Sequence, residues 1–246
     1  MKIRPFAAGI AAFLVTSAAS AEIITQWSFE GDTTAATTGV GAASLIGGTT
    51  ATFAAGSGGG RGWNTTTYRA QGAGSGEAGV RFLASTATGV GYENIQVSFA
   101  HRASGTASRW AQVDYTLDGG ATWVVGFWNN AGGLSPHDTF YNFTVDFSSI
   151  AGAGNNADFG FRIVSIFSPE AFDQNNALAE FAANTAYMRA NSAAVFSPNT
   201  STATGDYGAS GTWRFDNVMI SGSAIPSPAA AALLGAAGLV CVRRRR

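Results

Sequence analysis

The feature that most limits what this chain can fold into is a period-two alternation of apolar and polar residues. It is clearest at Ile95, Val97 and Phe99, which are separated by single polar residues. The same alternation recurs, with small departures, in residues 23–29, 111–117, 141–147, 159–167 and 213–220. Successive side chains of a strand point to opposite faces, so this spacing predicts strands with one face in a core and the other in water. Such strands are typical of antiparallel sheets.

The order of these segments predicts a β-sandwich. An apolar run at residues 123–128 is a further strand signal. The 246-residue chain thus carries seven or more strand signals, and strands do not alternate with helices. Sandwiches are built from many short strands joined by turns, such as the hairpin turn that Asp118 and two glycines predict. We therefore expect an all-β, jelly-roll-like antiparallel β-sandwich over residues 22–223. A bulge is expected near Asp216, where the apolar phase slips by one residue.

Residues 168–211 interrupt the strand series. Ser168, Pro169 and Glu170 have the order of an N-cap, a first helical residue and an acidic first turn. The apolar residues that follow predict one short amphipathic helix, and the segment then returns as a polar loop. We expect this part of the chain to be an insertion between the last two strands.

Charge argues against one large class of partner. Six of the fourteen basic residues lie near the two ends of the chain, so residues 22–225 hold eight arginines against fifteen acids, a net charge of −7. An acidic body without a basic cluster argues against nucleic acid as a partner. The one cysteine, Cys241, lies in the C-terminal tail, so we expect the body to have neither a disulfide nor a cysteine-ligated metal.

The N-terminus has the three parts of a secretion signal. Two basic residues open it, residues 6–15 are mostly apolar, and Ala19 and Ala21 form a small-x-small cleavage site. Cleavage there makes Glu22 the first residue of the mature protein. Because the apolar run is too short for a stable membrane span, we expect a signal helix within residues 1–21 and secretion by the export machinery.

The C-terminal tail, residues 224–246, joins a proline motif, an apolar run and a basic end. The motif is Pro226, Ser227 and Pro228, and fourteen apolar or small residues follow it. As a helix rising about 1.5 Å per residue, this run is shorter than a hydrocarbon core of about 30 Å, so we expect only transient membrane contact. The tail ends on Arg243, Arg244, Arg245 and Arg246. Such a cluster stays on the cytoplasmic side and halts export; the alternative is a weak C-terminal anchor.

In this order of elements the tail resembles the PEP-CTERM sorting signals of Gram-negative bacteria. The usual motif of that family is Pro-Glu-Pro, and Ser227 replaces the glutamate here. The resemblance implies recognition by an exosortase-type membrane protease that cuts near residues 226–228. It further implies release of the protein to the outer cell surface or to an extracellular matrix of exopolysaccharide.

The body resembles the jelly-roll, carbohydrate-binding-module-like domains of secreted bacterial proteins. The resembling motifs are WSFEG at residues 27–31, YENI at 92–95 and FDNV at 215–218. In such modules, an acid after the first strand and an aspartate before the last strand help to hold a structural calcium ion. The resemblance therefore implies that Glu30 and Asp216 converge on a calcium site. The alternative is two ordinary surface acids at strand ends.

Residues 116–123 resemble an Asp-box hairpin. In that motif Asp118 caps the turn and Trp123 packs beneath it. Propeller enzymes repeat the motif once per blade, and a single copy is expected to act as a folding device.

Trp128, Asn129 and Asn130 form the most sugar-like group in the sequence, because they end a strand and open a loop. An aromatic ring stacks on the apolar face of a sugar, and a neighbouring amide bonds its hydroxyl groups. This trio is the predicted ligand-binding site. The alternative is that the ring packs in the core or at its rim.

Catalytic signatures are missing from the sequence. His101 and His137 are the only histidines and lack zinc-ligand spacing, and there is no Gly-x-Ser-x-Gly elbow. A glycoside hydrolase needs a pair of acids across a cleft. Asp114 and Asp118 are four positions apart, but they lead into the hairpin, where Asp118 has a structural role. The sequence therefore favours a non-catalytic surface or matrix protein with weak glycan binding. The alternative is a secreted glycoside hydrolase or lyase on the same sandwich.

Overall fold

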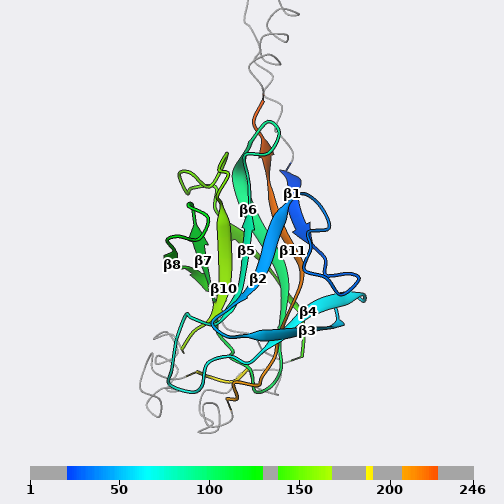
Figure 1. Cartoon of the computed structure of the whole chain (residues 1–246), viewed down its shortest axis with the longest axis vertical. Coiled ribbons are helices and arrows are strands. Elements are labelled where there is room, and N and C mark those ends of the chain that lie inside the picture. Colours follow the sequence, from blue (N-terminus) through cyan, green and yellow to red (C-terminus); the bar gives the residue numbers. More distant parts are fainter. Residues whose placement is uncertain (1–20, 130–137, 168–186, 191–206, 227–246) are drawn as a thin grey trace, which may run out of the picture.

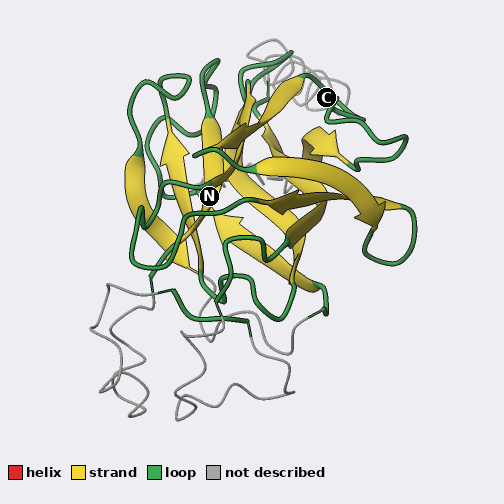
Figure 2. Ribbon diagram, turned by 60° about the horizontal axis from the view of Figure 1, so that its bottom comes forward, coloured by secondary structure: helices red, strands yellow, loops and turns green. Residues whose placement is uncertain are grey.

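The computed structural model describes residues 21–129, 138–167, 187–190 and 207–226. These residues form eleven β-strands in two antiparallel sheets that pack face to face (Figure 1, Figure 2). The described residues contain no helix, and therefore none long and apolar enough to cross a membrane. The prediction of an all-β antiparallel sandwich is confirmed.

Sheet A has six strands, and the long strands β6 and β11 form its centre. In spatial order its strands are β3 (Thr50–Ala55), β4 (Arg61–Thr66), β11 (Trp213–Ala224), β6 (Tyr92–Ala103) and β9 (Tyr141–Asp146), with β1 (Ala21–Trp27) beside the second half of β11. Because Ala21 pairs with Ser223 in antiparallel register, the first strand begins and the last strand ends at the same end of the sandwich.

Sheet B has five strands, with β10 at its centre. In spatial order they are β2 (Gly41–Ile46), β5 (Gly79–Ala84), β10 (Gly160–Ser165), β7 (Ala111–Thr116) and β8 (Val124–Asn129). Strands β7 and β8 form the expected hairpin, although its loop extends over residues 117–123.

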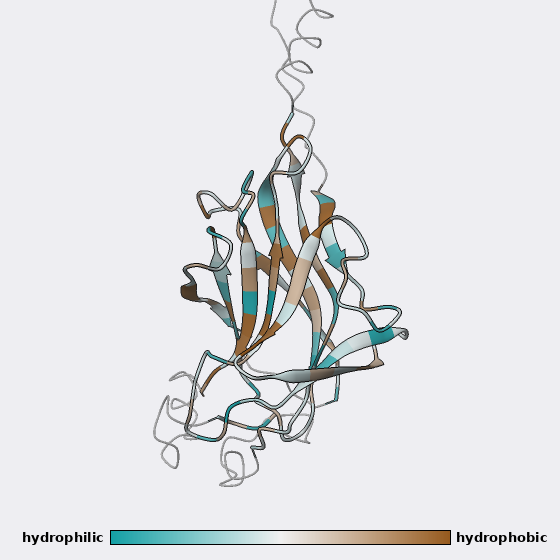
Figure 3. Ribbon diagram, in the orientation of Figure 1, coloured by the Kyte–Doolittle hydropathy of each residue, from teal (hydrophilic) through white to brown (hydrophobic). Residues whose placement is uncertain are grey.

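The core lies between the two sheets and is rich in aromatic side chains. Ile95, Val97 and Phe99 of β6 are at most 2% exposed, as the alternation predicts. From sheet B, the rings of Phe82 and Phe161 stack with their centroids 5.0 Å apart. Figure 3 shows apolar and polar bands alternating along the strands. The period-two spacing therefore assigns the inner face correctly.

Strands β2, β3, β4 and β5 were not expected as strands from the sequence. Strands β2 and β3 are mostly Gly, Ala, Ser and Thr, and β4 has Trp63 as its one large apolar residue. Strand β5 does carry Val80, Phe82 and Leu83. The glycine-rich stretches 56–62 and 72–79 run into two of these strands, since β4 begins at Arg61 and β5 at Gly79. Pairing of β4 with β11 and of β5 with β10 holds these two strands in the sheets, and β3 and β2 pair in turn with β4 and β5.

The expected bulge near Asp216 is present. The register between β11 and β6 shifts between Asp216 and Met219, and Asn217 has a φ of 48°. The shift lets Phe215 and Val218 both face the core with no exposed surface.

Several sequence predictions lie outside the described residues. These are the signal helix, the sorting motif from Ser227 onward with its apolar helix, and the helix expected within residues 168–186. Of the expected insertion, residues 187–190 and 207–211 are described. Tyr187, Met188 and Ala190 are fully buried, so this short segment packs into the body.

Candidate functional site

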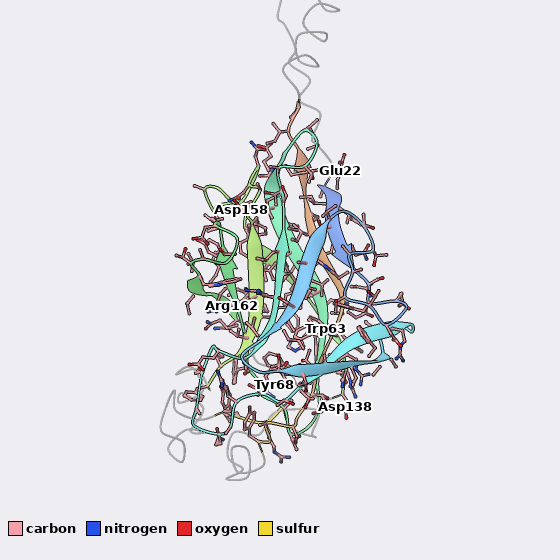
Figure 4. The ribbon with its side chains drawn as sticks, in the orientation of Figure 1. Glu22, Trp63, Tyr68, Asp138, Asp158 and Arg162 are labelled. Atoms are coloured by element: carbon pink, nitrogen blue, oxygen red, sulfur yellow. The ribbon has the colours of Figure 1, made fainter. Side chains whose placement is uncertain are left out.

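The outer face of sheet B carries a row of polar side chains from four neighbouring strands. Ser44 lies opposite Arg81, Arg81 opposite Arg162, and Arg162 opposite Asp114. The residues before and after each of these on β5, β7 and β10 belong to the core or face it, so the row points away from it. We call these four side chains the polar row; Arg162 is labelled in Figure 4.

Asp114 is the structural anchor of the polar row. Its side chain is fully buried, and Oδ2 accepts a hydrogen bond from Arg162 Nε at 2.7 Å. Oδ1 accepts two more, from Gln112 Nε2 at 2.7 Å and from the backbone N–H of Gly126 at 2.8 Å. Gly126 has a φ of 74° in an irregular stretch of β8, a conformation that favours glycine. The carboxylate thus ties β7, β8 and β10 together.

The Asp-box hairpin places Trp123 beside the polar row. Asp118 accepts hydrogen bonds from the Thr116 hydroxyl and from the backbone N–H and hydroxyl of Thr122. These bonds, those from Thr122 first, lower the pKa of Asp118 to about 2, and the predicted capping role is confirmed. The half-buried ring of Trp123 lies 4.8 Å from the Arg162 guanidinium carbon, a cation–π contact.

Arg81 carries the uncompensated charge of the polar row. Within the described part of the chain, its hydrogen bond runs from Nε to Ser44 Oγ at 2.8 Å, and no carboxylate pairs with it. Arg162 is neutralised by Asp114. The polar row therefore has a net charge of +1 on a body whose net charge is −7.

The predicted sugar-binding trio divides between two environments. Trp128 points inward from β8, where its ring meets Phe143 edge-on at 5.4 Å and Phe99 edge-on at 6.2 Å. Asn129 is exposed and lies opposite Gln112, whose amide bonds Asp114 of the polar row. Asn130 lies outside the described residues. Trp128 therefore packs at the rim of the core, and Asn129 borders the polar row.

A groove of about 470 Å³ lies between the edge strands β2 and β3. Phe53 and Trp63 line it from sheet A, and Asp32, Thr33 and Ser44 are among its polar lining residues. Because Ser44 also belongs to the polar row, the groove continues the polar surface around the edge of sheet B.

Glu30 and Asp216, the predicted calcium ligands, meet the same loop between β3 and β4. The backbone N–H of Ser57 donates to Asp216 Oδ2 at 2.7 Å, and that of Arg61 donates to Glu30 Oε1 at 3.0 Å. Burial raises the pKa of Asp216, the charge of Glu30 raises it further, and the N–H groups of Ser57 and Asn217 offset part of this. Two acids distant in the sequence are thus close enough to interact.

The loop fits these carboxylates only through its glycines. A Cβ on Gly60 would collide with the Glu30 carboxylate, and one on Gly56 would lie 2.5 Å from Asp216 Oδ2. Asp32 is already paired with Arg61 at 2.5 Å. Among the described residues, no group of three or more Asp, Glu, His or Cys side chains is arranged to hold a metal. A calcium ion here would therefore take its other ligands from backbone carbonyls and water.

Comparisons with known proteins return distant structural likenesses. No family profile and no curated protein matches the sequence. The tandem CBM22-1–CBM22-2 domain of Xyn10C from Paenibacillus barcinonensis is similar over 86% of this chain and 49% of its own, at 13% identity and a TM-score of 0.44. The CBM22-1–GH10 modules of xylanase 10B from Clostridium thermocellum, complexed with xylohexaose, are similar over 75% of this chain and 27% of their own, at 12% identity and a TM-score of 0.38. The chain thus spans half or less of either structure.

Proposed function

We propose that this chain is an exported, non-catalytic protein of the bacterial surface or extracellular matrix that binds polysaccharide through the outer face of sheet B. The observation that carries the proposal is the convergence of Trp123 with the guanidinium groups of Arg81 and Arg162 on the partly exposed outer face of one sheet. Planar hydrogen-bond donors beside an aromatic ring suit a sugar, which offers both hydroxyl groups and apolar C–H surface.

The distribution of tryptophans supports this choice of face. Of the six tryptophans, Trp27, Trp63, Trp110 and Trp213 are at most 3% exposed and serve the core. Trp128 retains some exposure, but it is wedged against Phe99 and Phe143. Trp123 is thus the tryptophan whose partial exposure adjoins polar donors that are themselves partly exposed.

The state of the acids near this face supports a non-catalytic role. A glycoside hydrolase needs two carboxyl groups across a cleft, about 5–9 Å apart. Asp114 is fully buried and accepts three hydrogen bonds, and Asp118 caps the hairpin. Both carboxylates are used to hold the fold.

The export part of the proposal rests on the two chain ends. The leader with its cleavage site after Ala21 and the tail beginning at Pro226 support secretion and trimming by an exosortase-type protease. Strand β1 begins at Ala21, and the backbone N–H of Ile225 donates to Gly91 O at 3.0 Å. Both proposed cuts therefore fall at the margins of the folded sandwich: the first removes only Ala21 from β1, and the second lies beyond Ala224, where β11 ends. Figure 4 shows Glu22 at the upper end of the molecule, beside β11.

A structural calcium ion is part of the proposal. Glu30 and Asp216 are the charged ligands, held against the loop of residues 56–61. The ion would neutralise two neighbouring carboxylates, one of them buried, and so fix β1, β4 and β11 to one another.

The test of function is binding and turnover measured on the same polymers. The full chain is run through native gels that contain single polysaccharides, and reducing ends are measured in parallel. We expect retardation without new reducing ends, and Trp123→Ala should weaken retardation about fivefold, whereas Trp123→Phe keeps most of it. Release of sugar that survives purification and is lost in a single-acid variant would establish the hydrolase or lyase alternative.

A second experiment tests the processing. Mass spectrometry of the mature protein from its own host should show a first residue of Glu22 and a C-terminus near residues 226–228. A cytosolic product with both ends intact contradicts the export proposal.

A further inference from the structure

We infer that the glycan site on sheet B is selective for acidic polysaccharides, with Arg81 as the residue that binds the sugar's anionic group. The inference rests on the proposed glycan binding and adds to it the charge of the ligand. Its basis is the pairing of two arginines, Arg81 and Arg162, directly opposite each other on neighbouring strands.

This pairing is unfavourable for the sheet alone. Like charges directly opposite each other in an antiparallel pair destabilise it. The neighbouring strand supplies one acid, Asp114, and its carboxylate bonds Arg162. For Arg81 the partner on the next strand is the neutral hydroxyl of Ser44. A second anion, supplied by a ligand, would balance the pair.

The guanidinium group of Arg81 and the ring of Trp123 both lie near Gly120. Nη1 of Arg81 is 3.9 Å from the position that a Cβ on Gly120 would occupy, and a ring carbon of Trp123 is 3.4 Å from the same point. Arg162 in turn lies over the Trp123 ring. Two guanidinium groups and one aromatic ring therefore lie close together beside the loop that joins β7 and β8.

The donors of Arg81 that remain are suited to a carboxylate or a sulfate ester. Among the described residues its one hydrogen bond uses Nε, so Nη1 and Nη2 keep their N–H groups for a ligand. The guanidinium fork matches two oxygens of a planar carboxylate, and charge-assisted bonds of this kind are stronger than bonds to a hydroxyl group. A neutral sugar would leave the charge of Arg81 uncompensated.

The charge of the whole body adds selectivity. At −7 over residues 22–225, it repels an acidic polymer everywhere except where positive charge gathers. The polar row, at +1, is such a place. The positive charge of the polar row offsets this repulsion locally.

Sheet A offers a matched arginine pair with a different use. Arg214 lies opposite Arg102, but Arg102 is paired with Asp138. Arg214 donates to Asn64 Oδ1 at 3.1 Å and to Ala55 O at 2.7 Å, which ties β11 to β3 and β4. Arg214 has structural partners for its donors, so it provides a control of equal charge on the other sheet.

The experiment compares two pairs of polymers, and the members of each pair differ only in their acid group. Binding of the full chain is measured by affinity electrophoresis with polygalacturonate, with the same polymer after reduction of its carboxyl groups, with dextran sulfate and with dextran. We expect binding to polygalacturonate to fall about tenfold on carboxyl reduction and to weaken with added salt. Comparable binding of dextran sulfate but not dextran would identify a sulfate ester as a second acceptable anion.

The variants locate the effect. Arg81→Gln should weaken binding of the acidic polymer at least fivefold and weaken binding of the reduced polymer by a clearly smaller factor, because only the charge-assisted bond is specific to the acid. Arg81→Lys, which keeps the charge but loses the fork, should fall between the two. Arg214→Gln should stay within twofold of the parent. Thermal melting of each variant checks that the fold is intact.

Two outcomes overturn the inference and differ from failure of the proposed function. Equal binding of the reduced and acidic polymers, or an equal loss in Arg81→Gln and Arg214→Gln, removes acidic selectivity but keeps glycan binding. Binding to no polymer, with every variant folded, removes the proposed function itself.

Discussion

His101 lies nearly parallel to Phe215, with ring centroids 4.6 Å apart and planes 18° from parallel. The two residues are opposite each other on β6 and β11, and Trp213 meets the imidazole edge-on at 4.7 Å. Neither ring nitrogen has a hydrogen-bond partner among the described residues, and the side chain is fully buried. Burial lowers the pKa of His101 to about 3. This histidine therefore acts as a neutral aromatic ring of the core.

The first prediction follows from that pKa. The unfolded chain protonates His101 below a pKa of about 6.5, whereas the folded protein keeps it neutral down to about 3. The contribution of His101 is therefore complete above pH 6.5 and is lost as the pH falls, by up to about 1.4 kcal/mol per pH unit. Urea unfolding between pH 4.5 and 7 measures the slope, in a range where most carboxylates stay ionised. His101→Phe should flatten it, and an unchanged slope would assign it to other groups.

The second prediction concerns the loop that meets Glu30 and Asp216. Gly60→Ala puts a methyl group into the Glu30 carboxylate at a φ of 67°, and calcium-dependent stabilisation should disappear. Gly58 has a similar φ of 76° with open space around its Cβ position, so Gly58→Ala carries the same backbone strain without the collision. The measurement is the shift in melting temperature between calcium and a chelator. No shift in the parent protein contradicts the calcium proposal.

The third prediction separates two tryptophans. Trp128→Ala opens the rim of the core beside Phe99 and Phe143, and should cost about 2–3 kcal/mol of unfolding free energy. Trp123→Ala removes a ring that lies over Arg162 at the surface, and should cost about 1 kcal/mol while weakening glycan binding. Denaturant unfolding and affinity electrophoresis are measured on both. If Trp128→Ala loses binding at unchanged stability, the sugar-stacking role predicted for Trp128 holds instead.

The fourth prediction addresses the anchor of the polar row. Asp114→Ala leaves Arg162, Gln112 and the N–H of Gly126 without their acceptor, and should cost about 2–4 kcal/mol. Asp114→Asn keeps an acceptor for Gly126 and should cost less. Chemical denaturation gives both values. Equal, small losses would mean that water replaces the carboxylate on this face.

The sequence allowed the inner face of the sandwich to be predicted, because alternation at residues such as Val97 and Phe161 is a local signal. It did not reveal β2, β3 and β4, because small residues carry little signal and several pairing partners lie 30 or more positions away, as between Gly41 and Ala84 or Phe215 and Trp63. Strand β5 was also missed, although its short apolar alternation around Arg81 is a local signal. Glu30 and Asp216 were singled out because each belongs to a short motif, and their role as calcium ligands stays a prediction.

The polar row could not be predicted in the same way. Arg81 and Arg162 are opposite each other only through the register of β5 and β10, and an isolated arginine in a strand looks like any solvent-facing residue. Trp123 was assigned to the hairpin and Trp128 to the sugar site, because the sequence does not show which strand-end ring turns inward. The body has eight arginines and no lysine, but this composition does not indicate which arginines lie side by side.

The position of β11 has a mechanical consequence. The strand is flanked along its length by β6 on one side and by β4 and then β1 on the other. A pulling force applied at residue 226 runs along this strand, so the backbone bonds on both flanks resist it together in shear. A force that separates residue 21 from residue 223 instead peels β1 from its neighbour one bond at a time, so the amino-terminal strand would yield first.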